Sequence, residues 1–385
     1  MHFSTLLCLI PVLCLIPLST ARYNHIFPSN ISNTPLNADY LTPTIDNSDL
    51  DAPKLSHANS STFDWWTFDA LAAESDSDST NTSASVSITF SSSGPEGYPL
   101  WFPAPTPGHD NGAAHSLWAH IWISFPDGRT FNLDKEVEAA RIYGSGDSVI
   151  STWDGAGRFM GSEEGYELEI GVFQDVPEFA ERVNLTGRIS YERITDAHSQ
   201  CSTPGNFTNA LNIGSSGLGW VSVMPDAIAT VDFSVNGERL QFVGYGGHDK
   251  IWTSRPFTSA TKSLVLGRAH LGLYSVLWLA YTPSTGDNTG TQQIVSSFIA
   301  RDGETVSSGC TEGSVAIEQG VQETEGELVN GFRVSVPGGT VSIAADVETG
   351  RVQGDASHLK WIGRASGMFG DGEEEGGAVL ERFVY

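Results

Sequence analysis

Residues 117–125 form an extended stretch whose side chains could hold and polarise a small molecule. Strict alternation puts Trp118, His120 and Trp122 on one face of a strand and aliphatic residues on the other. Two flat indole rings flanking a hydrogen-bonding imidazole suit stacking against a planar ligand and polarising one of its oxygens. Ordinary packing is the alternative, because tryptophan is also common in β cores.

Residues 264–281 form a second stretch of this kind. If they make one regular strand, one face is aliphatic and the other carries Arg268, His270, Tyr274 and Trp278. A buried charge is costly without a partner, so ionisable groups among aromatic rings favour the wall of a cavity over simple packing.

A hairpin and a glycine-rich segment precede this stretch. Residues 227–235 alternate with period two, and Asn236-Gly237 then predicts a type I′ turn. Three glycines follow within residues 244–252, directly before His248 and Asp249. We expect His248 and Asp249 to be structural, because an Asp after two glycines can accept backbone N–H bonds and fix the segment.

The motifs of several large enzyme classes are absent from the sequence. It contains no nucleophile elbow, phosphate-binding loop, dinucleotide fingerprint or H-E-x-x-H zinc motif. His109, His115 and His120 are spaced too irregularly to predict a metal site. We therefore expect no metal and no cofactor. A glycosidase pair of carboxylates stays open, because acidic residues are abundant.

The pattern of the whole chain is that of an all-β protein. Short alternating segments, frequent turns and almost no helical periodicity predict antiparallel sandwiches or barrels. Only residues 133–142 suggest a short helix. Because a cavity-type strand occurs in each half, we expect two antiparallel β-domains with a pocket between or within them.

Composition divides the chain into four parts. Residues 1–21 predict a secretory signal peptide, with an apolar core and a small-residue cleavage site. Residues 22–61 are polar and proline-dotted, which predicts a flexible arm. The remaining chain is assigned to an N-terminal β-domain, residues 62–250, and a C-terminal β-barrel domain, residues 251–385.

Several features agree with passage through the secretory route, from which we expect a secreted or vacuolar protein. Cys201 and Cys310 are the cysteines left after removal of the signal, and an oxidising compartment favours a disulfide over two buried thiols. Five glycosylation sequons follow the signal, at Asn30, Asn59, Asn81, Asn184 and Asn206. The net charge of −26 argues against nucleic acid and anionic membranes as partners, and no segment is long and apolar enough to span a bilayer.

Three motifs resemble those of the fungal Diels–Alderases, pericyclases of natural-product pathways with a calycin-like β-fold that hydroxyneurosporene synthases share. The first is Asp64-Trp65-Trp66-Thr67-Phe68-Asp69. The second is Gly246-Gly247-His248-Asp249-Lys250-Ile251-Trp252, and the third is Leu271-Gly272-Leu273-Tyr274, where the family usually has Pro in place of Leu273. The signal and sequons are similar to those of the hetero-Diels–Alderases of tropolonic sesquiterpenoid pathways.

The resemblance implies a set of pocket residues and a cofactor-independent [4+2] cycloaddition of a polyketide or terpenoid substrate. Asp64, His120 and Lys360 would supply the hydrogen bond that polarises one reactant. The substrate would lie against the remaining pocket residues, which are Trp66, Trp118, Trp122, Trp220, Trp252, His270, Tyr274 and Trp278.

A cycloaddition needs no nucleophile or redox group, which agrees with the absent motifs. Holding the two reactants together can supply roughly 7–11 kcal/mol, and one well-placed hydrogen bond about 2.7–4 kcal/mol. The hetero-Diels–Alderase case would join a humulene-type alkene to a tropolone quinone methide. The alternatives are a lipocalin-like ligand carrier, a hydratase or isomerase of the same fold, and a secreted glycosidase.

Overall fold

The computed structural model describes residues 21–32, 50–73, 84–97, 115–145, 148–176, 181–201, 213, 217–284, 293–320, 331–349, 358–370 and 372–385. Residues 1–20 of the predicted signal peptide, residues 1–21, and the sequons at Asn81 and Asn206 lie outside these ranges. Among the other sequons, Asn30 and Asn184 are exposed and Asn59 is half-buried.

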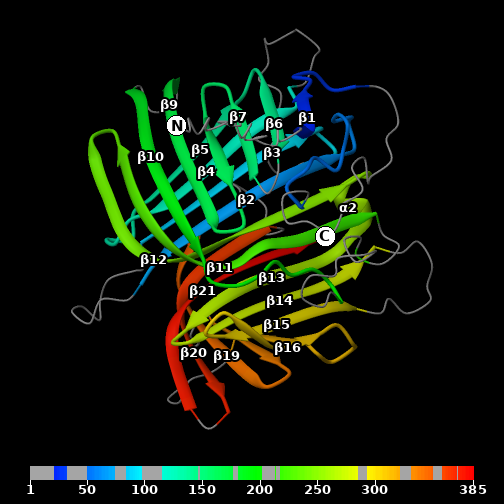
Figure 1. Ribbon diagram of the computed structural model, residues 1–385, viewed down its shortest axis with the longest axis vertical. Coiled ribbons are helices and arrows are strands. Elements are labelled where there is room, and N and C mark those ends of the chain that lie inside the picture. The colour runs from blue at the N-terminus through cyan, green and yellow to red at the C-terminus, as the bar shows by residue number, and fades with distance from the viewer. Residues whose placement is uncertain are drawn as a thin grey trace, which may run out of the picture.

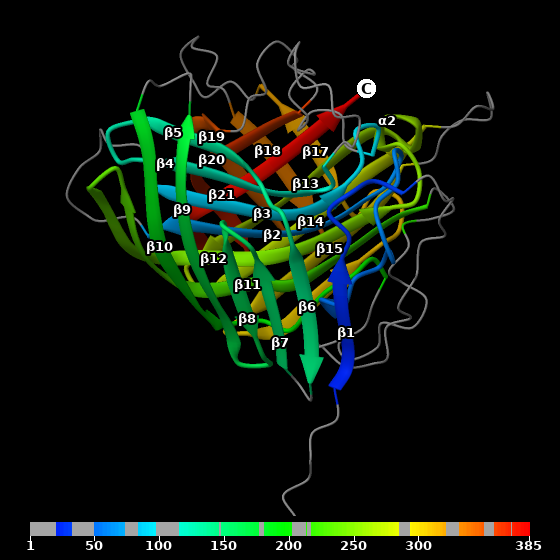
Figure 2. The ribbon, with the colours of Figure 1, turned by 90° about the horizontal axis from the view of Figure 1, so that it is seen from above.

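Two curled antiparallel sheets make up the molecule, as the sequence predicts, and each closes around a core of its own (Figures 1 and 2). The first sheet has the strand order β1-β6-β7-β8-β9-β10-β11-β12-β2-β3-β4-β5. Its strands are β1 (Ala21–Phe27), β2 (Phe63–Ala72), β3 (Ser85–Ser93), β4 (Leu117–Ser124), β5 (Thr130–Glu136), β6 (Ala140–Ser145), β7 (Ser148–Trp153), β8 (Gly157–Gly161), β9 (Gly165–Val176), β10 (Glu181–Arg193), β11 (Leu218–Val235) and β12 (Glu238–Thr253).

The second sheet has the order β16-β15-β14-β13-β21-β20-β19-β18-β17. One short helix, α2 (Phe257–Ala260), leads from the first sheet into it. Its strands are β13 (Thr261–Leu271), β14 (Tyr274–Pro283), β15 (Ile294–Arg301), β16 (Glu304–Gly309), β17 (Ala316–Gln319), β18 (Gly331–Val336), β19 (Gly339–Thr349), β20 (His358–Phe369) and β21 (Gly372–Val384).

The buried hydrophobic side chains of the described residues form three main cores and a small cluster of Leu71, Ile362 and Val379. One fills the first sheet, and a second, containing Trp278 and Trp361, fills the second sheet. The third combines residues of both sheets, including Trp65, Trp220 and Phe383, and therefore lies at the domain junction. Figure 1 shows β11, β13 and β21 at this junction, between the upper and lower halves of the molecule.

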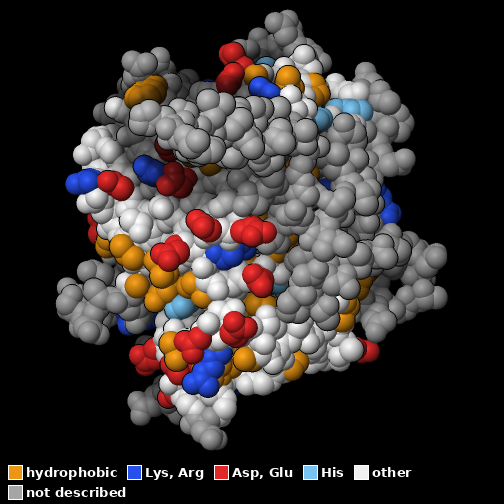
Figure 3. All heavy atoms as spheres, viewed as in Figure 1, with side chains coloured by type: hydrophobic (Ala, Val, Ile, Leu, Met, Phe, Trp, Pro, Cys, Tyr) orange, Lys and Arg blue, Asp and Glu red, His pale blue; other side chains and the backbone are white. Residues whose placement is uncertain are grey.

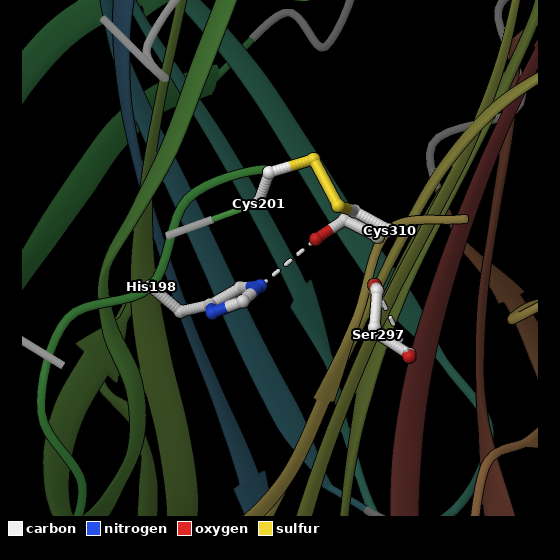
Figure 4. The surroundings of a disulfide bond; sticks show 6 residues. His198, Cys201, Ser297 and Cys310 are labelled. Carbon is white, nitrogen blue, oxygen red and sulfur yellow. Dashed lines mark hydrogen bonds between the residues drawn. A yellow bond between two sulfur atoms is a disulfide. The ribbon is translucent and has the colours of Figure 1, made fainter. Parts of the chain in front are cut away.

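Several local predictions are confirmed. Asn236 and Gly237 both have positive φ, 52° and 88°, between paired strands β11 and β12, as a type I′ hairpin requires. Cys201 and Cys310 form a disulfide with Cα atoms 5.2 Å apart. It links the chain after β10 to the chain after β16, and therefore joins the two domains (Figure 4).

Two predictions about secondary structure are wrong. Residues 264–281 are not one strand, because Gly272, at φ 56°, and Leu273 make a tight turn between β13 and β14, with Leu271 paired to Tyr274. Residues 133–142 contain no helix. They belong to β5 and β6, because pairing with β4 and β7 outweighs the weak local helical preference.

The predicted domain boundaries also need correction. The arm at residues 22–61 is not free, since β1 pairs with β6 and residues 50–55 are buried. The boundary at residue 250 falls inside β12, which stays in the first sheet up to Thr253, whereas the second sheet begins at Thr261. The polar composition of residues 22–61 wrongly predicted a flexible arm, because its polar groups bond to residues far along the chain.

Candidate active site

Strand alternation decides which side chains face each interior. On β2, Asp64, Trp66 and Phe68 point into the barrel of the first sheet, whereas Thr67 and Asp69 point toward the second sheet. Residues that are neighbours in the Asp64–Asp69 motif therefore belong to two different environments.

The barrel of the first sheet is filled by the protein's own chain. The segment of residues 50–58, which we call the plug, is largely buried and contributes Leu50 to that core. The indole Nε1 of Trp66 donates a hydrogen bond to the backbone oxygen of Asp51 at 2.9 Å. The Asp51 carboxylate accepts hydrogen bonds from Tyr166 and from Nε2 of His248, the latter at 2.7 Å.

His248 has a structural place in this barrel. Its Nδ1 lies 2.9 Å from the backbone oxygen of Thr67, so both ring nitrogens donate and the ring is an imidazolium. The ring stacks on Phe68 with centroids 3.9 Å apart. Burial is the largest single effect and raises the pKa of Asp51, but His248, the Tyr166 hydrogen bond and the charge of Lys250 together hold that pKa below its usual value.

Asp64 is engaged in the same interior. It forms an ion pair with Lys250, and its second oxygen accepts the backbone N–H of Lys54 at 2.6 Å. The ammonium of Lys250 lies 3.5 Å from the ring centroid of Trp66. Burial lowers the pKa of Lys250 to about 8, against the raising effect of the Asp64 carboxylate. These contacts hold the plug in place and leave Asp64 away from the domain junction.

Four predicted pocket residues belong to barrel cores. Trp66 and Trp252 are fully buried in the first core, and Trp278 is fully buried in the second. Tyr274 packs against the second core and stacks on Phe369 at 4.7 Å. The structure therefore does not bring these rings together on the walls of one pocket.

The domain junction carries a chain of buried ionic groups. Nζ of Lys360 on β20 donates to Asp69 on β2 at 2.5 Å and to the hydroxyl of Ser87 at 2.8 Å. Glu381 on β21 lies 3.9 Å from the same nitrogen and 2.6 Å from Nε2 of His358. Burial is the largest single effect and raises the pKa of Asp69, but the charges of Lys360 and Arg268 and the hydrogen bonds from Lys360 and Ser87 together lower it below its usual value. Lys360 thus joins the two sheets.

The predicted aromatic face of β4 lies on this side of the first sheet. Trp122 contacts His358 with ring centroids 5.7 Å apart. His120 is buried, with Nδ1 2.7 Å from Asp134 and Nε2 3.4 Å from Ser91. Trp118 stacks with His120 at 6.3 Å, and Trp220 is buried in the junction core. Both nitrogens of His120 are thus engaged by protein groups.

Arg268 of β13 crosses to the first sheet. It forms an ion pair with Asp249 on β12, and its Nη1 donates to the backbone oxygen of Met224 at 3.2 Å. A Cβ at Gly247 would lie 1.4 Å from that Nη1, so only glycine leaves room for the guanidinium. Asp249 thus lies in strand β12 and pairs with Arg268 of the second sheet, whereas the sequence predicted a carboxylate that accepts backbone N–H bonds in a tight loop.

A small cavity opens beside these groups. It offers about 40 Å³ to the centres of water molecules and is lined from both sheets. Its walls are Asp69, Leu71, Ala72, Ala73, Pro225, Asp226, Tyr245, Gly246, Arg268, Ala269, His270, Gly376, Gly377, Ala378 and Val379. Figure 3 shows hydrophobic side chains gathered around a histidine at the level where the sheets meet, with acidic side chains around them.

His270 is the predicted residue that lines this cavity. Its Nδ1 lies 2.7 Å from Oδ2 of Asp226, and its ring stacks on Tyr245 with centroids 3.3 Å apart. The hydroxyl of Ser275 donates to the same Asp226 oxygen at 2.5 Å. The site therefore combines an oriented imidazole with an arginine and an apolar mouth.

Sequence reasoning missed Asp226. It follows Pro225 within β11, where the pairing with β12 shifts register on both sides of Met224. A proline inside a strand indicates a bulge, and bulges often re-aim a side chain beside a functional site. The proline is visible in the sequence and could have pointed to Asp226. No comparable neighbouring residue singles out Tyr245 or Ser275.

The described residues contain neither a metal-ligand cluster nor a membrane-spanning helix. Nowhere in the described ranges do three or more His, Cys, Asp or Glu side chains gather as metal ligands would. The described part of the chain also holds no helix of the length and apolarity that a membrane span requires.

Comparison with known proteins places this architecture. The chain matches the family described as Diels-Alderase-like over residues 29–319, which is more than half of its length. It is 27% identical over 270 residues to the quinolone epoxide rearrangement protein AsqO of Emericella nidulans, covering 70% of this chain and 66%, just under two thirds, of AsqO. It is 26% identical to the quinolone epoxide rearrangement protein PenF of Penicillium thymicola, covering 88% of this chain and 89% of PenF.

Two further likenesses agree with this match. The Diels-Alderase MpsD of Macrophomina phaseolina is 24% identical over 47% of this chain and 44% of MpsD. The crystal structure of CghA with Sch210972 shares the fold, with a TM-score of 0.66 and 15% identity over 94% of this chain and 98% of that one. The chain belongs to the Diels-Alderase-like family, and this membership supports an enzyme of the cycloaddition type.

Proposed function

We propose that this protein is a pericyclase that binds a small molecule at the domain junction and directs a stereoselective [4+2] cycloaddition. The observation that carries the proposal is the cavity between the sheets, where Arg268 and His270 adjoin apolar side chains of both domains. Such a site can hold a flat reactant and donate a hydrogen bond to its oxygen without nucleophilic chemistry.

The size of the cavity limits how a substrate would bind. A volume of about 40 Å³ admits a group of a few heavy atoms, not a whole polycyclic molecule. We therefore place the polar group that is activated, such as a ring carbonyl, inside the cavity. The hydrocarbon part would lie over the apolar mouth, near the exposed Val243 and Ile228.

The contents of the first barrel argue against the lipocalin-like carrier. A carrier of that type holds its ligand inside the barrel, but here the plug and the Asp51–His248 and Asp64–Lys250 pairs occupy this space. A hydratase acting at His248 is disfavoured for the same reason, because that ring is fully buried and donates from both nitrogens.

A second candidate is an acid-assisted epoxide rearrangement. It is favoured by one observation, the imidazole of His270 held by Asp226 in the cavity, and by the similarity to the quinolone epoxide rearrangement proteins AsqO and PenF. A quinolone-type substrate and the tropolone quinone methide implied by the resemblance of the signal and sequons to hetero-Diels–Alderases share a flat ring with an oxygen. A meroterpenoid product remains part of the proposal.

We also propose that the protein travels through the secretory route and is glycosylated. The exposed side chains of Asn30 and Asn184 and the Cys201–Cys310 disulfide support this assignment. Treating the protein from its natural host with a glycosidase should lower its apparent mass, and an unchanged mass would contradict the proposal.

The decisive experiment incubates the pure protein with a metabolite extract of a host strain that lacks its gene. A new product with one dominant stereoisomer supports the enzyme, whereas depletion of a metabolite without product supports a carrier. Tyr245→Leu should lower the rate and the isomer ratio, because Tyr245 lines the cavity. The matched control is Tyr274→Leu, since Tyr274 packs against the second barrel core. Equal loss in both variants would remove the site assignment.

A further inference from the structure

The hydrogen bonds around His270 fix the orientation of its imidazole ring in the cavity. His270 comes from β13, Asp226 from the bulge of β11 and Ser275 from β14. Asp226 Oδ2 accepts a hydrogen bond from Nδ1 of His270 at 2.7 Å and another from Ser275 at 2.5 Å. The Ser275 bond holds the carboxylate in place, and the carboxylate orients the imidazole ring. Tyr245 holds the other side of the imidazole by stacking, with 12° between the ring planes.

This arrangement leaves one ring nitrogen for a ligand. Nδ1 is engaged, and Nε2 has no hydrogen-bond partner among the described residues, while His270 lines the cavity. The side chain is 12% exposed, so it is shielded but reachable. A histidine with one nitrogen bound to a carboxylate and the other open toward a cavity is the geometry of a proton donor or acceptor.

Charged groups from three strands surround His270. Asp226 on β11 and Asp69 on β2 line the same cavity, and Arg268 on β13 is the permanent cation there. Arg268 is already paired with Asp249, and Asp69 with Lys360. Asp226 bonds Nδ1 of His270 and also interacts electrostatically with Arg268, so the carboxylate, the imidazole and the guanidinium form one polar cluster at the cavity.

We propose that His270 is the acid–base residue of this site and that Asp226, supported by Ser275, is its positioning residue. The inference deepens the proposed function and rests on it for the identity of the ligand. In a cycloaddition, Nε2–H donates a hydrogen bond to a carbonyl oxygen of one reactant, which lowers the energy of its acceptor orbital, and no proton is consumed.

In an epoxide rearrangement, the same group makes a full transfer. The Nε2 proton moves to the epoxide oxygen as one C–O bond breaks, and its electron pair stays on that oxygen. A neighbouring group migrates with its bonding pair to the cationic carbon. The hydroxyl proton then returns to Nε2 as the new C=O bond forms, so the product is an isomer of the substrate.

Two substitutions separate the hydrogen bond from the proton transfer. His270→Gln keeps a neutral N–H donor toward the cavity, whereas His270→Asn places its amide near Asp226 and removes that donor. With the metabolite extract as substrate source, we expect both variants to lose about 10²-fold in rate if a proton is transferred. If the step is a cycloaddition, Gln should retain most of the rate and Asn should lose it. A wild-type rate in both variants would overturn the inference while leaving the proposed function intact.

A chemical probe tests the geometry without any substrate. Diethyl pyrocarbonate acylates the neutral imidazole at an accessible nitrogen, and peptide mass spectrometry gives the rate for each histidine. At pH 6, Asp226→Asn should label His270 about three- to tenfold faster than wild type, because the charged carboxylate no longer holds Nδ1 and the ring becomes easier to acylate. The matched control is His115, which pairs with Glu136 at the surface and should label equally in both proteins.

Saturating 2-quinolone serves as the ligand probe in the same assay. It should slow labelling of His270 at least severalfold and leave His115 unchanged. Equal labelling of His270 with and without Asp226, or no protection by the probe, would refute the assignment. If labelling and protection behave as expected but no extract yields a product, the proposed function fails and the acid–base site stands.

Discussion

Removal of the Lys360 ammonium is the sharpest test of the ionic junction between the domains. Lys360→Met keeps the length of the side chain but leaves Asp69 and Glu381 without the cation that lies 2.5 Å and 3.9 Å from their oxygens. Two unit charges 4 Å apart interact by about 4 kcal/mol at an effective dielectric constant of 20. Removing one partner of a buried pair costs about 3–5 kcal/mol, because the other charge stays buried.

We therefore expect Lys360→Met to lower the free energy of unfolding by about 3–5 kcal/mol. Guanidinium titration followed by tryptophan fluorescence measures this change. Asp69→Asn alone should cost a similar amount. The double variant should recover part of the loss, because it removes both partners, and the cycle of four proteins gives the coupling free energy.

The pH dependence of this loss provides a second check. In the wild type the pKa values of Asp69 and Glu381 lie below their usual values, because Lys360 and the neighbouring charged and hydrogen-bonding groups together outweigh burial, the largest single effect. Their contribution is thus present above the ordinary carboxylate pKa and disappears as pH falls through the lowered values. Without Lys360 the carboxyls protonate more easily, so the cost of the substitution should shrink below about pH 4. A cost under about 1 kcal/mol at pH 7, typical of an exposed pair, would refute the reasoning.

Three further predictions concern other parts of the fold. Replacing Cys201 and Cys310 by serine should cost up to about 5 kcal/mol in unfolding experiments, because the disulfide closes a span of 109 residues, and an unchanged midpoint would contradict this. Burial lowers the pKa of His198 to about 4, so stability should fall by about 3 kcal/mol from pH 7 to pH 4 relative to His198→Gln; parallel pH curves would contradict the lowered value. Asp51→Asn should destabilise by about 3–5 kcal/mol, because it leaves the imidazolium of His248 without its counterion, yet keep the isomer ratio of the product. A changed ratio with unchanged stability would mean that the plug belongs to the active site.

Much of the fold follows from local pattern. Alternation in residues 117–125 correctly placed Trp118, His120 and Trp122 on one face of β4, and Asn236-Gly237 located the hairpin between β11 and β12. Both signals depend only on neighbours along the chain, which is why a single sequence contains them.

The remainder depends on contacts that a local pattern does not encode. Each curled sheet is buried on both faces near the junction, so periodicity shows that Trp66 and Asp69 face opposite ways but not which interior each enters. The turn at Gly272-Leu273 interrupts no hydrophobic run, which hid the hairpin. The ionic groups at the cavity come from β2, β11 and β13, and only the packing of the two sheets brings them together.

The plug also has a consequence for the order in which the chain folds. Asp51 leaves the ribosome early, but His248, which neutralises it, lies 197 residues later. At a synthesis rate of about 5–20 residues per second, the interval is about 10–40 s. During that time the acidic and basic groups of residues 50–58 stay in water, because the first barrel cannot close before β12 exists. The N-terminal domain is therefore dominated by long-range contacts, so its folding is slow and must wait until almost two thirds of the chain, up to Thr253, has been synthesised.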